Sequence, residues 1–142
     1  MKIFLAQTDT TVGFLSQDPQ RLREAKGREE SKPFLKVFSS LQTLRMQLRI
    51  PNAHKRRVRY SRKTTFIVKN QAFRYVTDPE HSRLIDRHGW FYSTSANESG
   101  ASFDPSFCFD RADWIVEDNR GLSERSSSKI YRLGQKRLKR LR

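Results

Sequence analysis

The stretch that decides the fold is Trp90-Phe91-Tyr92-Ser93-Thr94-Ser95-Ala96-Asn97-Glu98-Ser99-Gly100. Its three aromatic residues are typical of the end of a buried strand, and a run of hydroxyl, amide and small side chains follows them directly. Such polar groups at the mouth of a strand can line a pocket for a polar ligand, although Ser, Asn and Gly also form ordinary turns. The stretch therefore predicts a strand that ends in a candidate binding loop.

Strands and helices are interleaved on both sides of this stretch. Helices begin at Asp18-Pro19 and Asp78-Pro79, because Asp caps a helix N-terminus and Pro suits the first helical position, and they end at Gly27 and Gly89. A third helix follows Ser40. Strands are expected over residues 2–7, 34–38, 64–68, 73–76, 90–92, 114–117 and 129–133. This pattern predicts the α/β class, a single-domain twisted mixed sheet with helices packed on it.

Three segments carry no clear strand or helix signal. Residues 8–13 are expected to form a polar turn, and residues 52–63 a basic loop. Residues 135–142 place Leu138 and Leu141 among cations, which fits either a short amphipathic helix or a mobile basic tail. We therefore assign residues 1–134 to one domain and residues 135–142 to a basic C-terminal tail.

Composition limits the possible classes of protein. The chain has 142 residues, 35% of them hydrophobic and 11% aromatic, which is enough for a packed core and too aromatic for a disordered chain. No run approaches the ~20 apolar residues that span a bilayer, and the apolar start is too short for a signal peptide. Cys108 is the only cysteine, so neither an intrachain disulfide nor a Cys-rich zinc site is expected. A cytoplasmic location with no membrane contact is the default expectation.

Positive charge is concentrated in two segments. The net charge is +14, and residues 55–63 and 132–142 hold many cations and no acid. This distribution indicates a polyanionic partner such as RNA, with equal weight given to basic segments that only aid solubility. The candidate RNA-binding residues are Lys55, Arg56, Arg57, Arg59, Arg62 and Lys63.

A second cluster of cations surrounds a glycine upstream. Lys26-Gly27-Arg28 and Ser31-Lys32-Pro33 place three cations within seven residues. Guanidinium and ammonium groups suit phosphate, although solvated loops have similar composition, and we expect Lys26 to be a surface-accessible cation. Other site classes are excluded by missing motifs. The chain has no Walker or dinucleotide fingerprint, no nucleophile elbow at Ser95, and no metal-ligand spacing among its three histidines, His54, His81 and His88.

Taken in chain order, four blocks of sequence are similar to the YrdC-like family, the threonylcarbamoyl-AMP synthases of tRNA modification. The blocks are the turn from Thr8 to Gly13, Lys26-Gly27-Arg28 with Lys32-Pro33, Thr94–Gly100, and Ser128 before a strand. The resemblance implies a YrdC-like fold. It also implies condensation of L-threonine, bicarbonate and ATP to threonylcarbamoyl-AMP and pyrophosphate, for N6-threonylcarbamoyladenosine formation in tRNA.

The same resemblance implies roles for individual residues and partners. Mg²⁺ would accompany ATP, tRNA or double-stranded RNA would be a partner, and other proteins would complete the threonylcarbamoyl transfer. The implied catalytic residues are Lys26 and Arg28, the nucleotide-binding residues are Lys26, Ser95, Asn97, Lys32 and Ser128, and the threonine-binding residues are Thr10, Thr11, Arg28 and Arg74.

The sequence departs from the family pattern at several positions. Val12 stands where the family has a tyrosine, Ser61-Arg62-Lys63 replaces a Pro-Gly-Pro turn, and Lys129 replaces a threonine. Two alternatives to the synthase therefore stay open. One is a catalytically reduced double-stranded RNA or tRNA-binding module on the same fold, and the other is a related ATP-dependent carbamoyl-transfer enzyme with a different acceptor.

Overall fold

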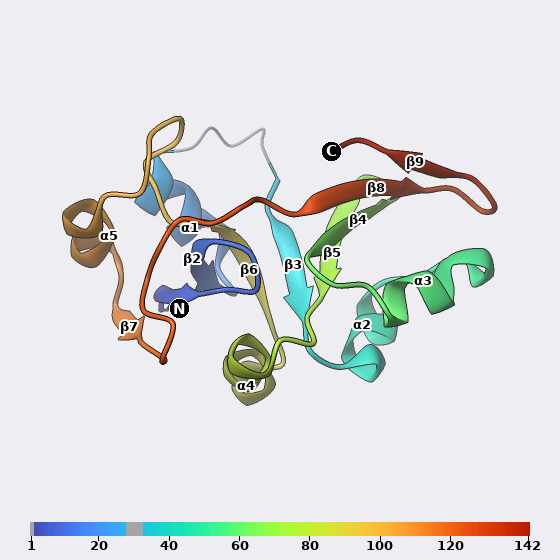
Figure 1. Cartoon of the computed structure of the whole chain (residues 1–142), viewed down its shortest axis with the longest axis horizontal. Coiled ribbons are helices and arrows are strands. Elements are labelled where there is room, and N and C mark those ends of the chain that lie inside the picture. The colour runs from blue at the N-terminus through green and yellow to red at the C-terminus, as the bar shows by residue number, and fades with distance from the viewer. Residues whose placement is uncertain (1, 28–32) are drawn as a thin grey trace. The chain divides into compact units, whose positions relative to one another are not determined.

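A computed structural model of the chain describes residues 2–27 and 33–142. The chain forms two compact units (Figure 1). Unit 1 comprises Met1–Phe34 and Phe91–Ser126, and unit 2 comprises Leu35–Trp90 and Ser127–Arg142. Each unit is therefore built from two segments that are distant in the sequence.

Unit 1 has four strands in the order β7-β1-β2-β6. The β1–β2 and β2–β6 pairs are antiparallel and the β1–β7 pair is parallel, so the pairing is mixed. Its core contains Leu5, Phe14, Leu22 and Cys108, all fully buried. The elements are β1 (Phe4–Gln7), β2 (Val12–Ser16), α1 (Pro19–Lys26), β6 (Trp90–Ser95), α5 (Pro105–Arg111) and β7 (Trp114–Val116).

Helix α1 has the limits that its sequence predicts. The Asp18 carboxylate accepts hydrogen bonds from the backbone N–H groups of Gln20 and Arg21, which would otherwise have no partner in the first turn. Gly27 ends the helix with φ +63°, a left-handed conformation that glycine adopts at little cost. The helix therefore carries Lys26 to its last position, next to the candidate binding loop.

Strand β2 corrects the expectation of a turn over residues 8–13. The turn is confined to the residues before Val12, and all five residues of β2 are buried. Gly13 is required by close packing, since a Cβ atom there would lie 2.9 Å from Thr8 Cγ2 and 3.1 Å from the Thr94 carbonyl oxygen. Gly13 also pairs with Ser95, so this glycine sets the distance between β2 and the strand that carries the candidate loop.

Unit 2 has five strands in the order β3-β5-β4-β8-β9. Helices α2 and α3 pack against these strands through a core that includes Leu44, Val58, Phe66 and Phe73 (Figure 1). The elements are β3 (Leu35–Phe38), α2 (Leu41–Gln47), a 3₁₀ turn (Asn52–His54), α3 (Lys55–Arg59), β4 (Thr64–Val68), β5 (Gln71–Tyr75), α4 (Pro79–His88), β8 (Lys129–Leu133) and β9 (Leu138–Arg140).

Two segments of unit 2 differ from the sequence expectations. The expected loop over residues 52–63 contains a 3₁₀ turn and α3, because Val58 is completely buried and anchors one turn of helix among cations. The C-terminal residues form neither a helix nor a mobile tail. Leu138–Arg140 pair with β8 in antiparallel register, with Leu138 opposite Leu133.

The α/β class with mixed strand pairing and packed helices is confirmed. Like α3, helix α5 is absent from the sequence expectations, although Asp104-Pro105 starts it just as Asp18-Pro19 starts α1. Over residues 2–27 and 33–142, every helix is too short or too polar to cross a bilayer.

Candidate functional site

The candidate loop after β6 encloses the ammonium group of Lys26. Lys26 Nζ donates to the Ser95 carbonyl oxygen at 2.9 Å, to Ser95 Oγ at 3.2 Å and to Asn97 Oδ1 at 3.0 Å. Ser95 Oγ also donates to Asn97 Oδ1 at 2.6 Å. Three residues predicted for one site, from positions about 70 apart in the sequence, are thus in direct contact.

The burial of Lys26 corrects the expectation of a surface-accessible cation. The residue is only 4% exposed, whereas Ser95 is exposed and Asn97 half-buried. The three oxygen atoms that accept from Lys26 Nζ are formally neutral, so none of these three contacts neutralises the charge of the ammonium group. A desolvated cation attracts an anion more strongly than a solvated one, because the local dielectric constant is lower. The arrangement suits an anionic ligand that approaches from the side of Ser95.

The loop itself is fixed by hydrogen bonds to its backbone. Asn97 Nδ2 donates to the carbonyl oxygens of Glu98 at 2.9 Å and Ala101 at 2.6 Å, and Ser99 N donates to the Lys26 carbonyl at 3.1 Å. The amide of Asn97 therefore holds the loop with its nitrogen and Lys26 with its oxygen. A carboxylate at this position could not donate these bonds.

The thiol of Cys108 lies below the same loop. Its Sγ donates to the Ala96 carbonyl oxygen at 3.3 Å, and burial raises the pKa of the thiol. Lys26 has the opposite and smaller effect on this pKa. Cys108 is therefore a neutral packing residue at pH 7 and does not supply a thiolate to the site.

The turn between β1 and β2 is held by its own threonine side chains. Thr8 Oγ1 contacts Thr10 Oγ1 at 3.3 Å and donates to the Thr11 carbonyl at 2.5 Å. Thr11 Oγ1 accepts from the backbone N–H of Arg125 at 3.1 Å. Thr10 is buried and Thr11 half-buried, and the side-chain oxygen of each of these predicted threonine-binding residues already contacts a hydrogen-bonding partner.

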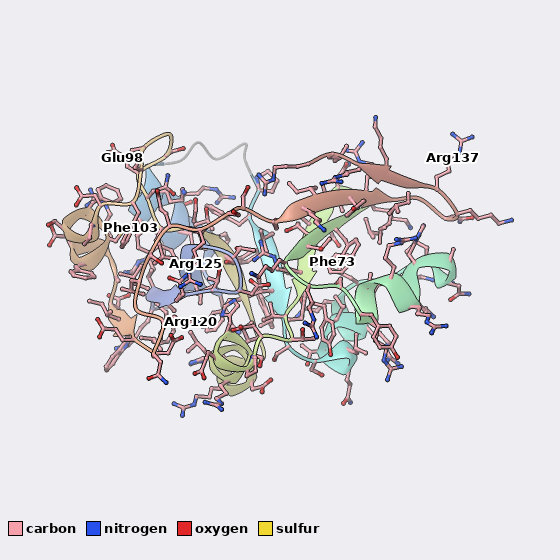
Figure 2. All side chains as sticks on the ribbon, viewed as in Figure 1. Phe73, Glu98, Phe103, Arg120, Arg125 and Arg137 are labelled. Atoms are coloured by element: carbon pink, nitrogen blue, oxygen red, sulfur yellow. The ribbon has the colours of Figure 1, made fainter. Side chains whose placement is uncertain are left out.

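Arg120 fastens this turn and was not predicted from the sequence (Figure 2). Its guanidinium donates to the carbonyl oxygens of Gln7 and Thr8 at 3.3 and 3.4 Å, and it forms an ion pair with Asp118 at 2.7 Å. The Arg120 side chain is the main reason that the pKa of Asp118 is lowered. Asp118-Asn119-Arg120-Gly121 reads as a plain surface turn, so the sequence carries no signal of this role.

Unit 2 holds a separate buried polar cluster around Arg74. Its guanidinium donates to Thr65 Oγ1 at 3.3 and 3.4 Å, and Thr65 Oγ1 lies 2.8 Å from Ser128 Oγ. Arg142 donates to the Ser128 carbonyl at 2.8 Å and to Ser128 Oγ at 3.3 Å. The structure thus brings the predicted residues Arg74 and Ser128 together through Thr65, which the sequence analysis missed.

The remaining predicted residues fall into two groups. Arg28 and Lys32 lie outside the described residues. All six candidate RNA-binding residues are exposed, and Lys55, Arg56 and Arg59 line an open hollow of unit 2, whereas Arg57, Arg62 and Lys63 do not. Within the described part of the chain, no three His, Cys, Asp or Glu residues are grouped so that they could hold a metal ion.

Comparison with known proteins finds matches among solved structures but none among family profiles or curated sequences. No protein-family profile and no curated protein sequence matches the chain. Sua5 of P. abyssi complexed with L-threonine superposes with a TM-score of 0.80 at 18% identity, over 99% of this chain and 50% of that one. E. coli YciO superposes with a TM-score of 0.77 at 17% identity, over 99% and 82%. Full-length HypF in its phosphate- and nucleotide-bound form superposes with a TM-score of 0.76 at 16% identity, over 99% and 26%.

These neighbours establish the fold. They are members of the Sua5/YrdC family, so the YrdC-like fold expected from the four sequence blocks is confirmed. The chain spans about half the length of Sua5. The departures at Val12 and at residues 61–63 are therefore compatible with this fold.

Proposed function

We propose that the chain synthesises threonylcarbamoyl-AMP from L-threonine, bicarbonate and ATP, with release of pyrophosphate. The observation that carries this proposal is the buried ammonium of Lys26, held by Ser95 and Asn97 at the end of β6. Two structural neighbours support the same pair of ligands. The Sua5 structure contains L-threonine, and the HypF structure contains phosphate and nucleotide.

The proposed reaction needs positioning and charge neutralisation more than covalent participation by the protein. Threonine and bicarbonate form a carbamate with loss of water, the carbamate attacks the α-phosphorus of ATP, and the bond from that phosphorus to the bridging oxygen of pyrophosphate breaks. Negative charge grows on the phosphate oxygens during this step. A fixed, desolvated ammonium such as that of Lys26 stabilises this charge without reorganisation.

The other predicted residues keep their roles as parts of this proposal. Arg28 and Lys32 would add charge at the phosphates, and Ser128 would contact the nucleotide. Thr10, Thr11 and Arg74 would position threonine. Mg²⁺ would enter with ATP, held by phosphate and water. The product would serve tRNA modification through further transfer proteins.

The direct test is threonine-dependent release of pyrophosphate. Purified protein is incubated with ATP, Mg²⁺ and bicarbonate, and pyrophosphate is measured with and without L-threonine, with L-serine and L-valine as controls for side-chain selectivity. We expect release with threonine alone among the three amino acids. Mass spectrometry of the nucleotide product must show threonylcarbamoyl-AMP.

The same assay separates the two alternatives. Pyrophosphate release without any amino acid would favour an ATP-dependent carbamoyl transfer to another acceptor. No release under any condition, from protein with an intact fold by circular dichroism, would favour the RNA-binding module. Either result would reject the synthase proposal.

A further inference from the structure

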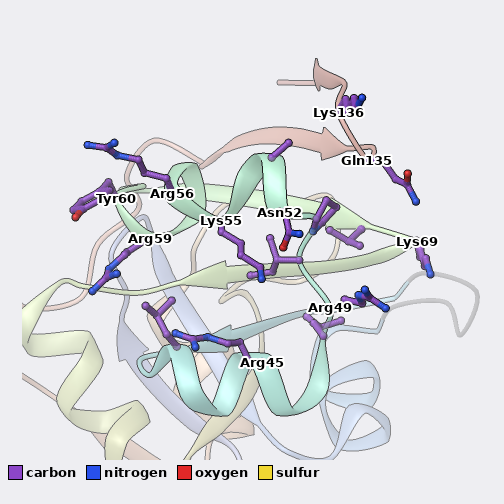
Figure 3. A pocket seen from close by; sticks show the side chains of 16 residues that line it. Arg45, Arg49, Asn52, Lys55, Arg56, Arg59, Tyr60, Lys69, Gln135 and Lys136 are labelled. Atoms are coloured by element: carbon purple, nitrogen blue, oxygen red, sulfur yellow. The ribbon is translucent and has the colours of Figure 1, made fainter.

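Unit 2 contains an open hollow that the proposed synthase reaction does not use. Its volume is about 1190 Å³, larger than the ~300–1,000 Å³ typical of pockets for one small molecule. It is lined by α2, α3, the β4–β5 turn and the β8–β9 turn (Figure 3). The size and openness suit an extended ligand.

Cations dominate the rim of this hollow. Seven of its 16 lining residues are Lys or Arg, and none of these lining residues is acidic. Arg45 and Arg49 come from α2 and its end, Lys69 from the β4–β5 turn and Lys136 from the β8–β9 turn. With Lys55, Arg56 and Arg59 from α3, four separate segments place cations around one hollow. A single basic loop exposed to solvent would not produce this arrangement. A polyanion is the ligand that this rim would attract.

The floor of the hollow is apolar. Leu48, Ile50 and Val68 line it, each less than 9% exposed and part of the unit-2 core. A double helix presents only phosphates and groove edges to a protein, so it would leave this floor unused. An unpaired nucleotide can place its base against such a surface while its phosphate meets the rim.

Tyr60 supplies a stacking surface at one end of the hollow. Its side chain is 70% exposed, and the guanidinium carbons of Arg56 and Arg59 lie 5.9 and 6.0 Å from the ring centre. Figure 3 shows these three residues at one end, with Lys69, Gln135 and Lys136 at the other. An exposed ring flanked by two guanidiniums is the combination on which unpaired bases stack in single-strand binding proteins.

A smaller hollow continues the cationic path along the β8–β9 hairpin. It has a volume of about 270 Å³ and shares Lys69 with the larger one. Its other cations are Arg132, Arg137 and Lys139. The phosphates of an RNA strand that extends from the larger hollow past Lys69 would therefore lie near further cations.

We propose that this surface of unit 2 binds single-stranded RNA, with phosphates on the rim and one unpaired base stacked on Tyr60. The site differs from the cluster around Arg74, which is buried, and it includes only half of the basic residues that the sequence suggested. It does not depend on the synthase proposal, because binding requires neither ATP nor threonine.

The test measures fluorescence anisotropy of a labelled 12-nucleotide single-stranded RNA of mixed sequence, without ATP or threonine. We compare the double variant Arg45→Gln/Arg49→Gln with Arg57→Gln/Arg62→Gln, which removes the same charge from exposed positions outside the hollow. We expect the hollow variant to lose about tenfold in affinity and the control no more than about threefold. Equal losses in the two variants would overturn the proposed location.

A second pair of variants tests stacking. Tyr60→Ala should weaken binding about tenfold and Tyr60→Phe less than about twofold, because phenylalanine retains the ring. A 12-base-pair RNA duplex should bind more weakly and respond to neither variant. An unchanged affinity in Tyr60→Ala, a duplex preference, or binding to phosphatidylserine vesicles with no binding to RNA would each overturn the proposal.

Discussion

The two units of this chain use positive charge in opposite ways. Unit 2 contains 20 Lys and Arg residues against three acids, whereas unit 1 contains nine against twelve. In unit 1 two cations are held by several polar groups each: Lys26 donates to three oxygen atoms, and Arg120 is paired with Asp118. In unit 2 most cations are exposed. The difference indicates that one buried charge serves a small anion, while many exposed charges serve a long one.

The largest effect should come from Lys26, the one buried cation among the described residues of unit 1. Lys26→Ala should lower threonine-dependent pyrophosphate release by about 10²- to 10³-fold, the loss seen when one fixed donor to a developing oxyanion is removed. Lys2→Ala, which removes an exposed lysine of the same unit, is the control and should stay within about twofold.

Because Lys26 is buried, its replacement can also affect folding. Thermal unfolding followed by circular dichroism is therefore measured for both variants. Ser95→Ala, at an exposed position, should lower the rate about tenfold without a shift of the melting temperature. Full activity of folded Lys26→Ala would show that the buried ammonium is only structural.

Salt should affect unit 2 more than unit 1. If about five phosphates meet the rim of the hollow, affinity for single-stranded RNA should fall about 100-fold between 50 and 200 mM NaCl, because bound counterions are released. Pyrophosphate release at saturating substrate should change only a few-fold, since the Lys26 charge is shielded from the solvent. If the affinity for RNA did not change with salt, the proposed difference in charge use between unit 1 and unit 2 would be wrong.

The smallest effect should come from the ion pair between Arg120 and Asp118, which holds the turn between β1 and β2. Arg120 holds the pKa of Asp118 below its usual value, so the carboxylate stabilises the fold above its unfolded pKa, and this stability is lost as pH falls through the lower folded pKa. Asp118→Asn should lower the free energy of unfolding by about 1 kcal/mol at pH 7, measured by urea denaturation. The difference in unfolding free energy between the wild type and Asp118→Asn should shrink toward pH 3. A difference that stays constant with pH would mean that the charge of Asp118 does not contribute to stability.

Local signals in the sequence were sufficient for the elements with clear ends. The limits of α1 and α4 follow from an Asp-Pro start and a Gly stop, which act within a few residues. The contact of Lys26 with Ser95 and Asn97 was anticipated only as a shared site. A separation of about 70 residues in the sequence does not predict the distances between their atoms, and the burial of Lys26 depends on packing in three dimensions.

The elements that escaped sequence reasoning are those stabilised by distant residues. Strand β2 has no alternation of polar and apolar residues, because both of its faces are covered. Helix α3 is four cations around one buried valine, and its stability comes from the core below Val58. Strand β9 exists because Leu138 meets Leu133 on β8. None of these partners is visible from the segment itself.

Gly13 has a consequence for attempts to redesign the candidate binding loop after β6. One added methyl group would contact Thr8 and the Thr94 carbonyl and push apart two strands that meet at Gly13 and Ser95. The Ser95 hydroxyl would then move relative to Lys26 although neither residue had changed. In a library designed to change ligand preference, this position is best kept constant and diversity placed at Glu98, which is exposed on the same loop (Figure 2). The position of the candidate binding loop thus depends on the absence of a Cβ atom at Gly13 of β2.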